Sequence, residues 1–103
     1  MEYQSGRKEA GAAGFNKALA LDPKNAAALN NLGNIDFLAG KFKEAELKYL
    51  KAGESDDQDP EIWLNLAKTE LKLGEKMKAK EFAERAVAVD SSLASAVETL
   101  IKE

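Results

Sequence analysis

The sequence contains no cysteine and no histidine among its 103 residues. Disulfides, thiolate metal sites, cysteine nucleophiles and histidine acid–base chemistry are therefore all excluded. No glycine-rich phosphate loop or nucleophile motif compensates for this loss. The remaining acid pairs, Asp56 with Asp57 and Glu44 with Glu46, are expected on turns or solvent faces. We therefore expect no catalytic activity, no bound metal and no cofactor.

The chain also lacks a surplus of positive charge and any long apolar run. Its formal net charge is −3 and its pI is about 5.1, whereas a nucleic-acid-binding protein normally carries a clustered basic surface. No apolar stretch approaches the ~20 residues that span a bilayer, and the N-terminal sequence MEYQSGRKEA has no signal-peptide core. We expect no nucleic-acid partner, no membrane insertion and a soluble chain, with the cytoplasm as the most compatible location for the sequence as written.

Two prolines and a few glycines divide the chain into helical segments. Asp22-Pro23 ends one segment, and Pro60 begins another after a capping Asp59. Gly40 and Gly74 are predicted to supply left-handed turns between paired helices. The apolar spacing predicts helices over residues 7–21, 25–39, 41–52, 60–73, 75–89 and 92–102, the last capped by Ser91 or Ser92. The second helix is expected to bury Leu29, Leu32 and Leu38.

The segment from residue 29 to residue 52 recurs with a period of 34 residues. Shifted forward, it places Leu29 on Trp63, Leu32 on Leu66, Gly33 on Ala67, Gly40 on Gly74, Ala45 on Ala79 and Ala52 on Ala86. Shifted back, Gly40 falls on Gly6 and Ala52 on Ala18. A fixed period of this length, with two helical patterns around a glycine, indicates a helical repeat array.

The acidic run GESDDQD, residues 53–59, is predicted to interrupt the 34-residue repeat. Pro23 to Pro60 is three residues longer than the period, which suggests an insertion in a surface turn. A calcium loop would need a central glycine and a correctly spaced bidentate glutamate, which this run lacks. We interpret it as a solvated turn.

The repeated pattern resembles the tetratricopeptide repeat family, whose motif runs W-x2-L-G-x2-Y, followed by an alanine, an aromatic residue, a second alanine and a proline. The better copy is Leu29, Leu32, Gly33, Gly40, Phe42, Ala45, Tyr49 and Ala52, and the second is Trp63, Leu66, Ala67, Gly74, Ala79 and Ala86. Asp36 and Glu70 stand where the motif prefers tyrosine, and Lys8 and Lys76 stand where Phe42 provides an aromatic.

The resemblance covers the whole chain and implies an all-α fold. We expect antiparallel helix-turn-helix repeats stacked as a short right-handed α-solenoid in one domain, 1–103. Its parts would be the return helix of a partial repeat (7–23), two full repeats (25–57 and 60–91) and a capping helix (92–103). Such arrays are scaffolds for protein–protein interaction, and this is the function that we expect.

In this family the first helix of each pair lines a concave groove. The resemblance therefore implies a peptide-binding groove formed by Asn30, Asn31, Asn34, Phe37, Leu38, Leu64, Asn65, Lys68 and Lys72. Asparagine amides can donate to and accept from an extended peptide backbone. They can equally satisfy polar groups of neighbouring helices, and the sequence leaves both interpretations open.

The groove positions match only part of the carboxylate clamp of chaperone-binding family members. Asn34 and Asn65 match two of its polar positions, whereas Asn30, Ser95 and Thr99 replace its basic residues. A chaperone tail is therefore not the expected ligand. Lys68 and Lys72 still favour an acidic or C-terminal segment of a partner protein.

Self-assembly is the alternative function. Phe15, Leu19 and Leu21 belong to a predicted return helix whose partner helix is missing apart from residues 1–6. Exposed apolar surface at that end would suit a homodimer interface.

Overall fold

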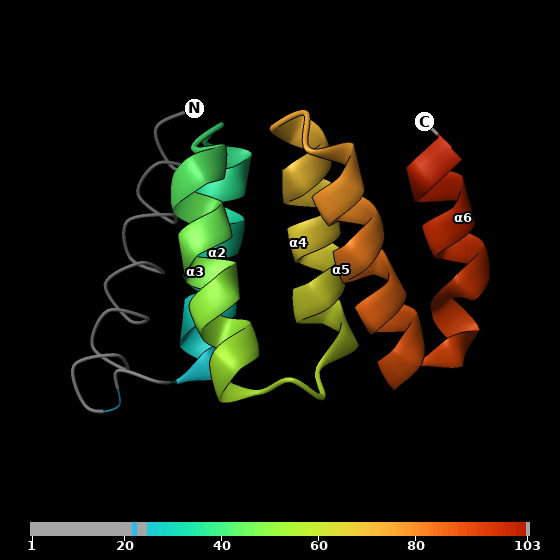
Figure 1. The fold of residues 1–103 in the computed structure, drawn as a ribbon. Helices are drawn as coiled ribbons and strands as arrows, with labels where there is room; N and C mark the ends of the chain where they lie inside the picture. Colours follow the sequence, from blue (N-terminus) through green and yellow to red (C-terminus); the bar gives the residue numbers. More distant parts are fainter. Residues whose placement is uncertain (1–21, 23–24, 103) are drawn as a thin grey trace.

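A computed structural model describes residue 22 and residues 25–102, and the described chain folds into five α-helices and one short 3₁₀ turn. The elements are α2 (Ala26–Leu38), α3 (Phe42–Ser55), α4 (Pro60–Lys72), α5 (Lys76–Val89), η1 (Ser91–Leu93) and α6 (Ala94–Lys102). Figure 1 shows the pair of α2 and α3, the pair of α4 and α5, and then α6 following one another across the molecule, with α2 partly behind α3. The predicted return helix of the partial repeat, and the apolar residues on which self-assembly rests, lie outside the described residues.

The helices repeat with a strict period of 34 residues. α2, α4 and α6 begin at residues 26, 60 and 94, and α3 and α5 begin at residues 42 and 76. The predicted insertion at residues 53–59 is therefore wrong. α3 continues through Gly53 to Ser55, which leaves only residues 56–59 to connect the repeats. The equivalent of the capping Asp59 is Asn25 rather than the residue before Pro23.

Short polar side chains begin the helices. Asn25 Oδ1 accepts a hydrogen bond from the Ala28 N–H at 2.9 Å, and Asp59 Oδ1 accepts from the Glu61 N–H at 3.0 Å. The predicted Asp59 cap is confirmed. The predicted serine cap of the last helix is wrong, because Asp90 Oδ1 accepts from the Ser92 N–H and the chain passes through η1 before α6. Each N-cap satisfies a backbone donor that has no partner within its helix.

Both predicted glycine turns are confirmed. Gly40 has a φ of +79° and Gly74 a φ of +80°, a left-handed conformation that costs little only without a Cβ. The turn at Gly40 is closed by a hydrogen bond of 2.8 Å from the Lys41 N–H to the Asp36 carbonyl, and Glu75 N–H repeats it on the Glu70 carbonyl. The two helices of each repeat therefore reverse direction through the same motif.

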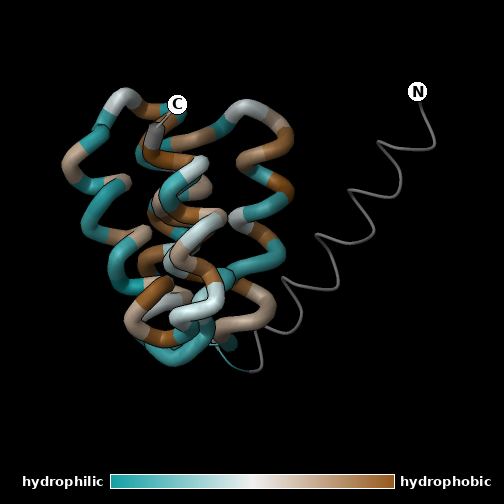
Figure 2. Tube along the Cα trace, turned by 90° about the vertical axis from the view of Figure 1, so that its right-hand side faces the viewer, coloured by the Kyte–Doolittle hydropathy of each residue, from teal (hydrophilic) through white to brown (hydrophobic). Residues whose placement is uncertain are grey.

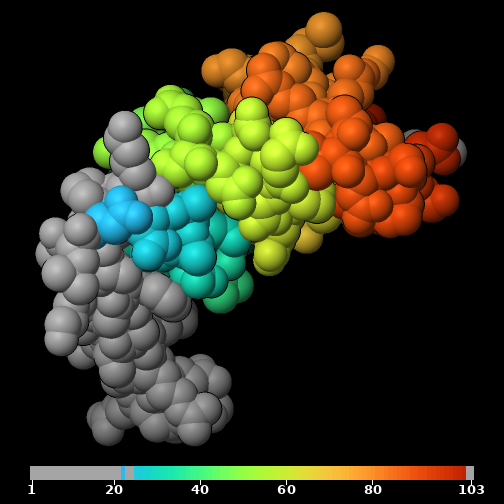
Figure 3. Space-filling view, turned by 90° about the horizontal axis from the view of Figure 1, so that it is seen from below, coloured from blue at the N-terminus to red at the C-terminus, as the bar shows by residue number. Residues whose placement is uncertain are grey.

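The described helices form two layers. Each helix packs on the next one along the chain, and α2 also touches α4 across the boundary between the repeats. Figure 3, seen along the helices, shows α3 and α5 on one side of the stack and α2 on the other, with successive repeats following each other in chain order. α2 and α4 are thus the neighbouring first helices of an array in which each unit contacts only its neighbours.

The core fills the space between the layers. Its main cluster joins both repeats and contains Leu29, Ala45, Tyr49, Ala52, Ile62, Trp63, Leu66 and Ala86. Figure 2 shows polar and apolar residues following one another along each helix, as expected for helices with one buried side. The predicted burial of Leu29 and Leu32 is confirmed, but Leu38 is 72% exposed because α2 ends there and the chain turns away from the core.

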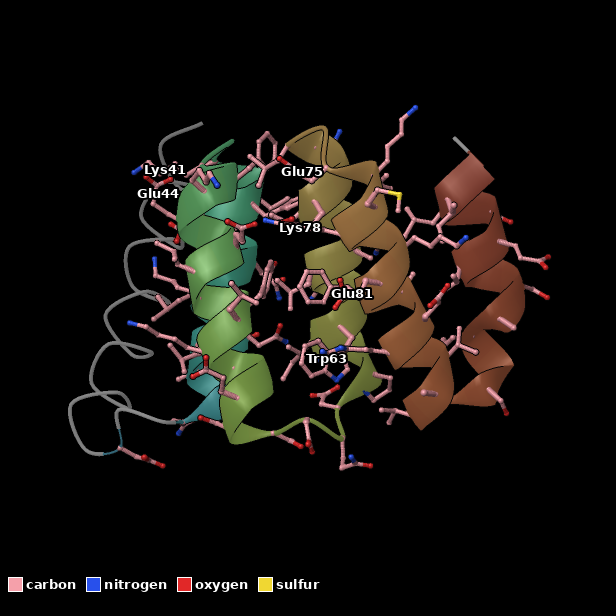
Figure 4. The ribbon with its side chains drawn as sticks, viewed as in Figure 1. Lys41, Glu44, Trp63, Glu75, Lys78 and Glu81 are labelled. Carbon is pink, nitrogen blue, oxygen red and sulfur yellow. The ribbon has the colours of Figure 1, made fainter. Side chains whose placement is uncertain are left out.

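Trp63 fastens the second repeat to the first. Its indole lies between α3 and α5 (Figure 4), stacks on the Phe82 ring at a centroid distance of 6.0 Å, and donates from Nε1 to the Asp57 carbonyl at 2.8 Å. A Cβ at Gly53 would stand 2.8 Å from the Trp63 ring, so α3 can approach α4 here only because it carries a glycine. No helix in the described part of the chain is long and apolar enough to cross a membrane.

Candidate functional site

Two adjoining pockets open on the side of the molecule formed by the first helices of the repeats. The first has a volume of about 300 Å³ and is lined by Asn34, Phe37, Leu38, Tyr49, Asn65 and Lys68. The second has a volume of about 350 Å³ and is lined by Phe37, Lys68, Leu71, Lys72, Lys76, Leu100 and Ile101. Because they share Phe37 and Lys68, they form one groove across α2, α4 and α6, which we call the α2/α4/α6 groove.

An asparagine network forms the wall of the first pocket. Asn65 Nδ2 on α4 donates to Asn30 Oδ1 at 3.0 Å and to Asn34 Oδ1 at 3.4 Å, both on α2. The Tyr49 hydroxyl also donates to Asn34 Oδ1. These bonds fix which end of each amide faces which neighbour, and they join the two repeats directly.

Tyr49 supplies a permanently protonated donor to this network. Its side chain is only 1% exposed, and burial, with the negative charges of Glu61 and Asp36, raises the pKa of Tyr49 to about 12. The Asn34 oxygen therefore stays occupied throughout the physiological range. Within the described residues the Asn34 Nδ2 group has no hydrogen-bond partner, so it is the polar atom that this wall can offer to a ligand.

The second pocket arises from a difference between the repeats. In the first repeat the Phe37 and Phe42 rings meet edge to face at 5.2 Å across the Gly40 turn. One period later, Leu71 and Lys76 take their places, and both line the second pocket. An aromatic corner is thus replaced by a smaller apolar side chain and a flexible cation, which leaves a hollow between α4 and α6.

The electrostatic character of the groove is positive. Lys68, Lys72 and Lys76 all line the second pocket, and no acidic residue lines either pocket among the described residues. The apolar lining comes from Phe37, Leu38, Leu71, Leu100 and Ile101. An arrangement of apolar hollows bordered by lysines can bind a segment that carries both apolar and negatively charged groups.

The structure brings together six of the nine predicted site residues. These are Asn34, Phe37, Leu38, Asn65, Lys68 and Lys72. Asn30 is 6% exposed and satisfies Asn65, and Leu64 is half-buried against the core. Asn31 is half-buried and lines neither pocket.

Five groove residues were not among the nine predicted site residues. Tyr49 was assigned to the core, and the other four are Leu71, Lys76, Leu100 and Ile101. Lys76 stands one period after Phe42, where the repeat motif has an aromatic residue. This replacement was the one signal in the sequence that pointed to the second pocket. Leu100 and Ile101 depend on how α6 packs, which the local pattern does not reveal.

The acidic turn between the repeats forms a local hydrogen-bonded loop. Asp56 Oδ1 accepts from the Gln58 N–H at 3.1 Å, and Asp57 Oδ1 accepts from Gln58 Nε2 at 3.1 Å. No group of acidic residues placed to hold a metal ion occurs in the described part of the chain. These side chains organise the turn that leads into the Asp59 cap.

Two family models of the tetratricopeptide repeat match the sequence, over residues 15–46 and 60–93. These matches, and the 34-residue spacing of the helices, show that the protein has a helical repeat fold. The chain belongs to the tetratricopeptide repeat family. No curated protein sequence matches it.

Solved structures share the fold at low sequence identity. The type III secretion chaperone SycD of Yersinia enterocolitica, in complex with a peptide of the translocator YopD, has a TM-score of 0.84 and 21% identity, covering 98% of this chain and 82% of SycD. PcrH with the chaperone-binding region of PopD has a TM-score of 0.82 and 21% identity over 98% and 80% of the two chains. The first repeat domain of Spaghetti (RPAP3), bound to the HSP90 peptide SRMEEVD, has a TM-score of 0.83 and 16% identity over 97% and 82%. At these identities the likeness establishes the fold.

Proposed function

We propose that this protein is an interaction scaffold that binds an extended segment of a partner protein in the α2/α4/α6 groove. The observation that carries the proposal is the continuity of the two pockets through Phe37 and Lys68. A row of small connected hollows suits successive side chains of a peptide, whereas a small molecule is normally enclosed in one deeper cavity.

Proteins of the same fold support a peptide ligand. SycD is seen with a peptide of YopD, and RPAP3 with the peptide SRMEEVD. The fold therefore accommodates short segments of other proteins. The asparagine wall supplies one free amide donor, at Asn34, for a peptide carbonyl.

The preferred ligand is an acidic segment with apolar anchors. Lys68, Lys72 and Lys76 would face its carboxylates, and the hollow beside Leu71 would take an apolar side chain. The clamp positions that resemble chaperone-binding family members are incomplete at Asn30, Ser95 and Thr99. We therefore expect recognition of distributed negative charge rather than of a single C-terminal carboxylate.

The test is selection of binders from a library of random peptides, followed by affinity measurement on two charge-reversal variants. Lys68→Glu with Lys72→Glu reverses two charges of the groove. We expect selected peptides to be rich in Asp and Glu and to lose at least about tenfold in affinity for this variant, equivalent to about 1.4 kcal/mol.

The control variant carries Lys51→Glu with Lys80→Glu, exposed lysines on α3 and α5 that line neither pocket. It changes net charge by the same amount and should leave affinity nearly unchanged. Equal losses in both variants would mean that net charge alone attracts the peptide. Unchanged binding to the Lys68 and Lys72 variant would place the site elsewhere.

A further inference from the structure

Glu70 is a carboxyl group enclosed between helices. Its side chain is 0% exposed, and Glu46 on α3, which lies within hydrogen-bonding reach of it, is 8% exposed. Among the described residues no N–H or O–H group donates to either Glu70 oxygen. An ionised Glu70 would therefore be a buried charge with no compensating hydrogen bond, which strongly destabilises a fold.

The first repeat shows what the second repeat has lost. Asp36, one period before Glu70, forms an ion pair with Lys48 of α3. One period after Lys48 stands Phe82, which stacks on Trp63. In the second repeat Phe82, which stacks on Trp63, therefore occupies the position that Lys48 has in the first repeat. Glu70 consequently has no lysine at this position and faces Glu46 instead.

We propose that Glu46 and Glu70 share one proton, and that this shared proton is part of the contact between the first and second repeats. Glu70 holds the proton and donates it to the carboxylate of Glu46. The hydrogen bond formed in this way joins the two buried side chains and leaves a single negative charge between them. Loss of the proton would place two carboxylates against each other between α3 and α4.

The charges around the pair agree with this assignment of roles. Lys43 of α3 lies 3.4 Å from Glu46 Oε1, and the Lys78 side chain extends from α5 toward α3 (Figure 4). The hydrogen bond from Glu70, and then Lys43, lower the pKa of Glu46 despite its burial. Burial raises the pKa of Glu70 to about 7, followed by the hydrogen bond with Glu46, the charge of Glu46 and the charge of Glu75 in the turn before α5, although Lys78 opposes this rise.

The direction of the pH effect follows from the raised pKa. Between the ordinary glutamate value of 4.5 and about 7, the folded protein binds one proton more than the unfolded chain at Glu70. Stability from this group is complete below that window and is lost as the pH rises through it. The folding equilibrium constant should fall by up to about tenfold per pH unit there, the limit for one proton.

The direct test is a carbon-detected NMR titration of the glutamate carboxyl groups in the unmodified protein. We expect the Glu70 signal to titrate near neutral pH, with a matching smaller displacement of the Glu46 signal as the shared proton leaves. A Glu70 signal that titrates near 4.5 would overturn the proposal. This measurement needs no variant and therefore does not depend on the folding of one.

Variants test the consequence for folding. Glu70→Gln imitates the neutral acid and keeps a donor for Glu46, so chemical unfolding should become independent of pH through the window in which the wild type weakens. Glu44→Gln changes an exposed glutamate of α3, the helix that carries Glu46 (Figure 4), and should keep the wild-type slope. The same slope in wild type and Glu70→Gln would contradict the proposal.

Discussion

Tyr49 and Gly33 show how a single residue sets the distance between two helices. A Cβ added to Gly33 would stand 2.6 Å from Tyr49 Cε1, well inside van der Waals contact. One period later the same two positions hold Ala67 and Ala83, both completely buried. One repeat thus pairs a large side chain with a glycine, and the other pairs two small side chains, so the contact between the helices is made differently in each repeat.

Gly33→Ala should therefore destabilise the protein, although alanine is the better helix former. We expect a loss of about 1–3 kcal/mol in the free energy of unfolding, measured in urea, because the Tyr49 ring must move. In a Tyr49→Ala background the same change should stabilise by up to about 1 kcal/mol, since only helix propensity remains. The same sign in both backgrounds would show that the Tyr49 ring does not limit position 33.

Residues whose roles follow from local rules were predictable, and those that depend on a distant neighbour were not. Gly40 is left-handed whatever surrounds it, because the turn itself requires positive φ. The sequence showed Glu70 as a departure from the motif's tyrosine. Its burial against Glu46 depends on Phe82 replacing the lysine that serves Asp36, which is a relation between three helices.

At the scale of the elements, the caps determine where each helix begins. Asp59 and Asn25 occupy equivalent positions one period apart, and both accept from a backbone N–H of the first turn. The prediction that residues 53–59 contain an insertion failed because it aligned prolines. The capping oxygens, rather than the prolines, are what the repeat keeps in place.

Asp59→Ala should cost about 0.5–2 kcal/mol in the free energy of unfolding, because the Glu61 N–H loses its acceptor at the start of α4. Asp57, an exposed residue of the same turn, provides the control. Asp57→Ala removes only a side-chain contact with Gln58 and leaves the Asp57 carbonyl free to accept from Trp63. We expect Asp57→Ala to change stability by less than about 0.5 kcal/mol in the same thermal or urea measurement. Equal losses would mean that the Asp59 side chain does not act as a cap.

At the scale of the molecule, the two repeats are joined on both layers. On one layer Trp63 and the pair of Glu46 with Glu70 lie at the boundary, and on the other layer Asn65 bonds to α2. The repeat architecture was predictable because every unit carries the same pattern of small and apolar residues. The shape of the α2/α4/α6 groove was not, since its second pocket depends on a single exception at Lys76 and on the packing of α6.

Substitution of Asn65 measures how strongly the contact between α2 and α4 couples the two repeats. Asn65→Ala removes the donor to both Asn30 and Asn34, and it leaves the Asn30 oxygen, in a side chain only 6% exposed, without that bond. We expect a loss of about 1–3 kcal/mol in the free energy of unfolding, the cost of a buried polar atom left unsatisfied. Hydrogen exchange should locate the effect in α2 and α4, the helices that the amide joins.

Asn31→Ala is the matched control, because Asn31 is half-buried on α2, the helix to which Asn65 bonds, and forms no side-chain hydrogen bond within the described residues. It should change stability by no more than about 0.5 kcal/mol. If Asn65→Ala were equally mild, the asparagine network would contribute nothing to repeat coupling. Its amides would then be available to a ligand rather than committed to the fold. Because Asn65 and Asn34 line the first pocket, this comparison measures how much of the groove wall is held rigid before any peptide binds.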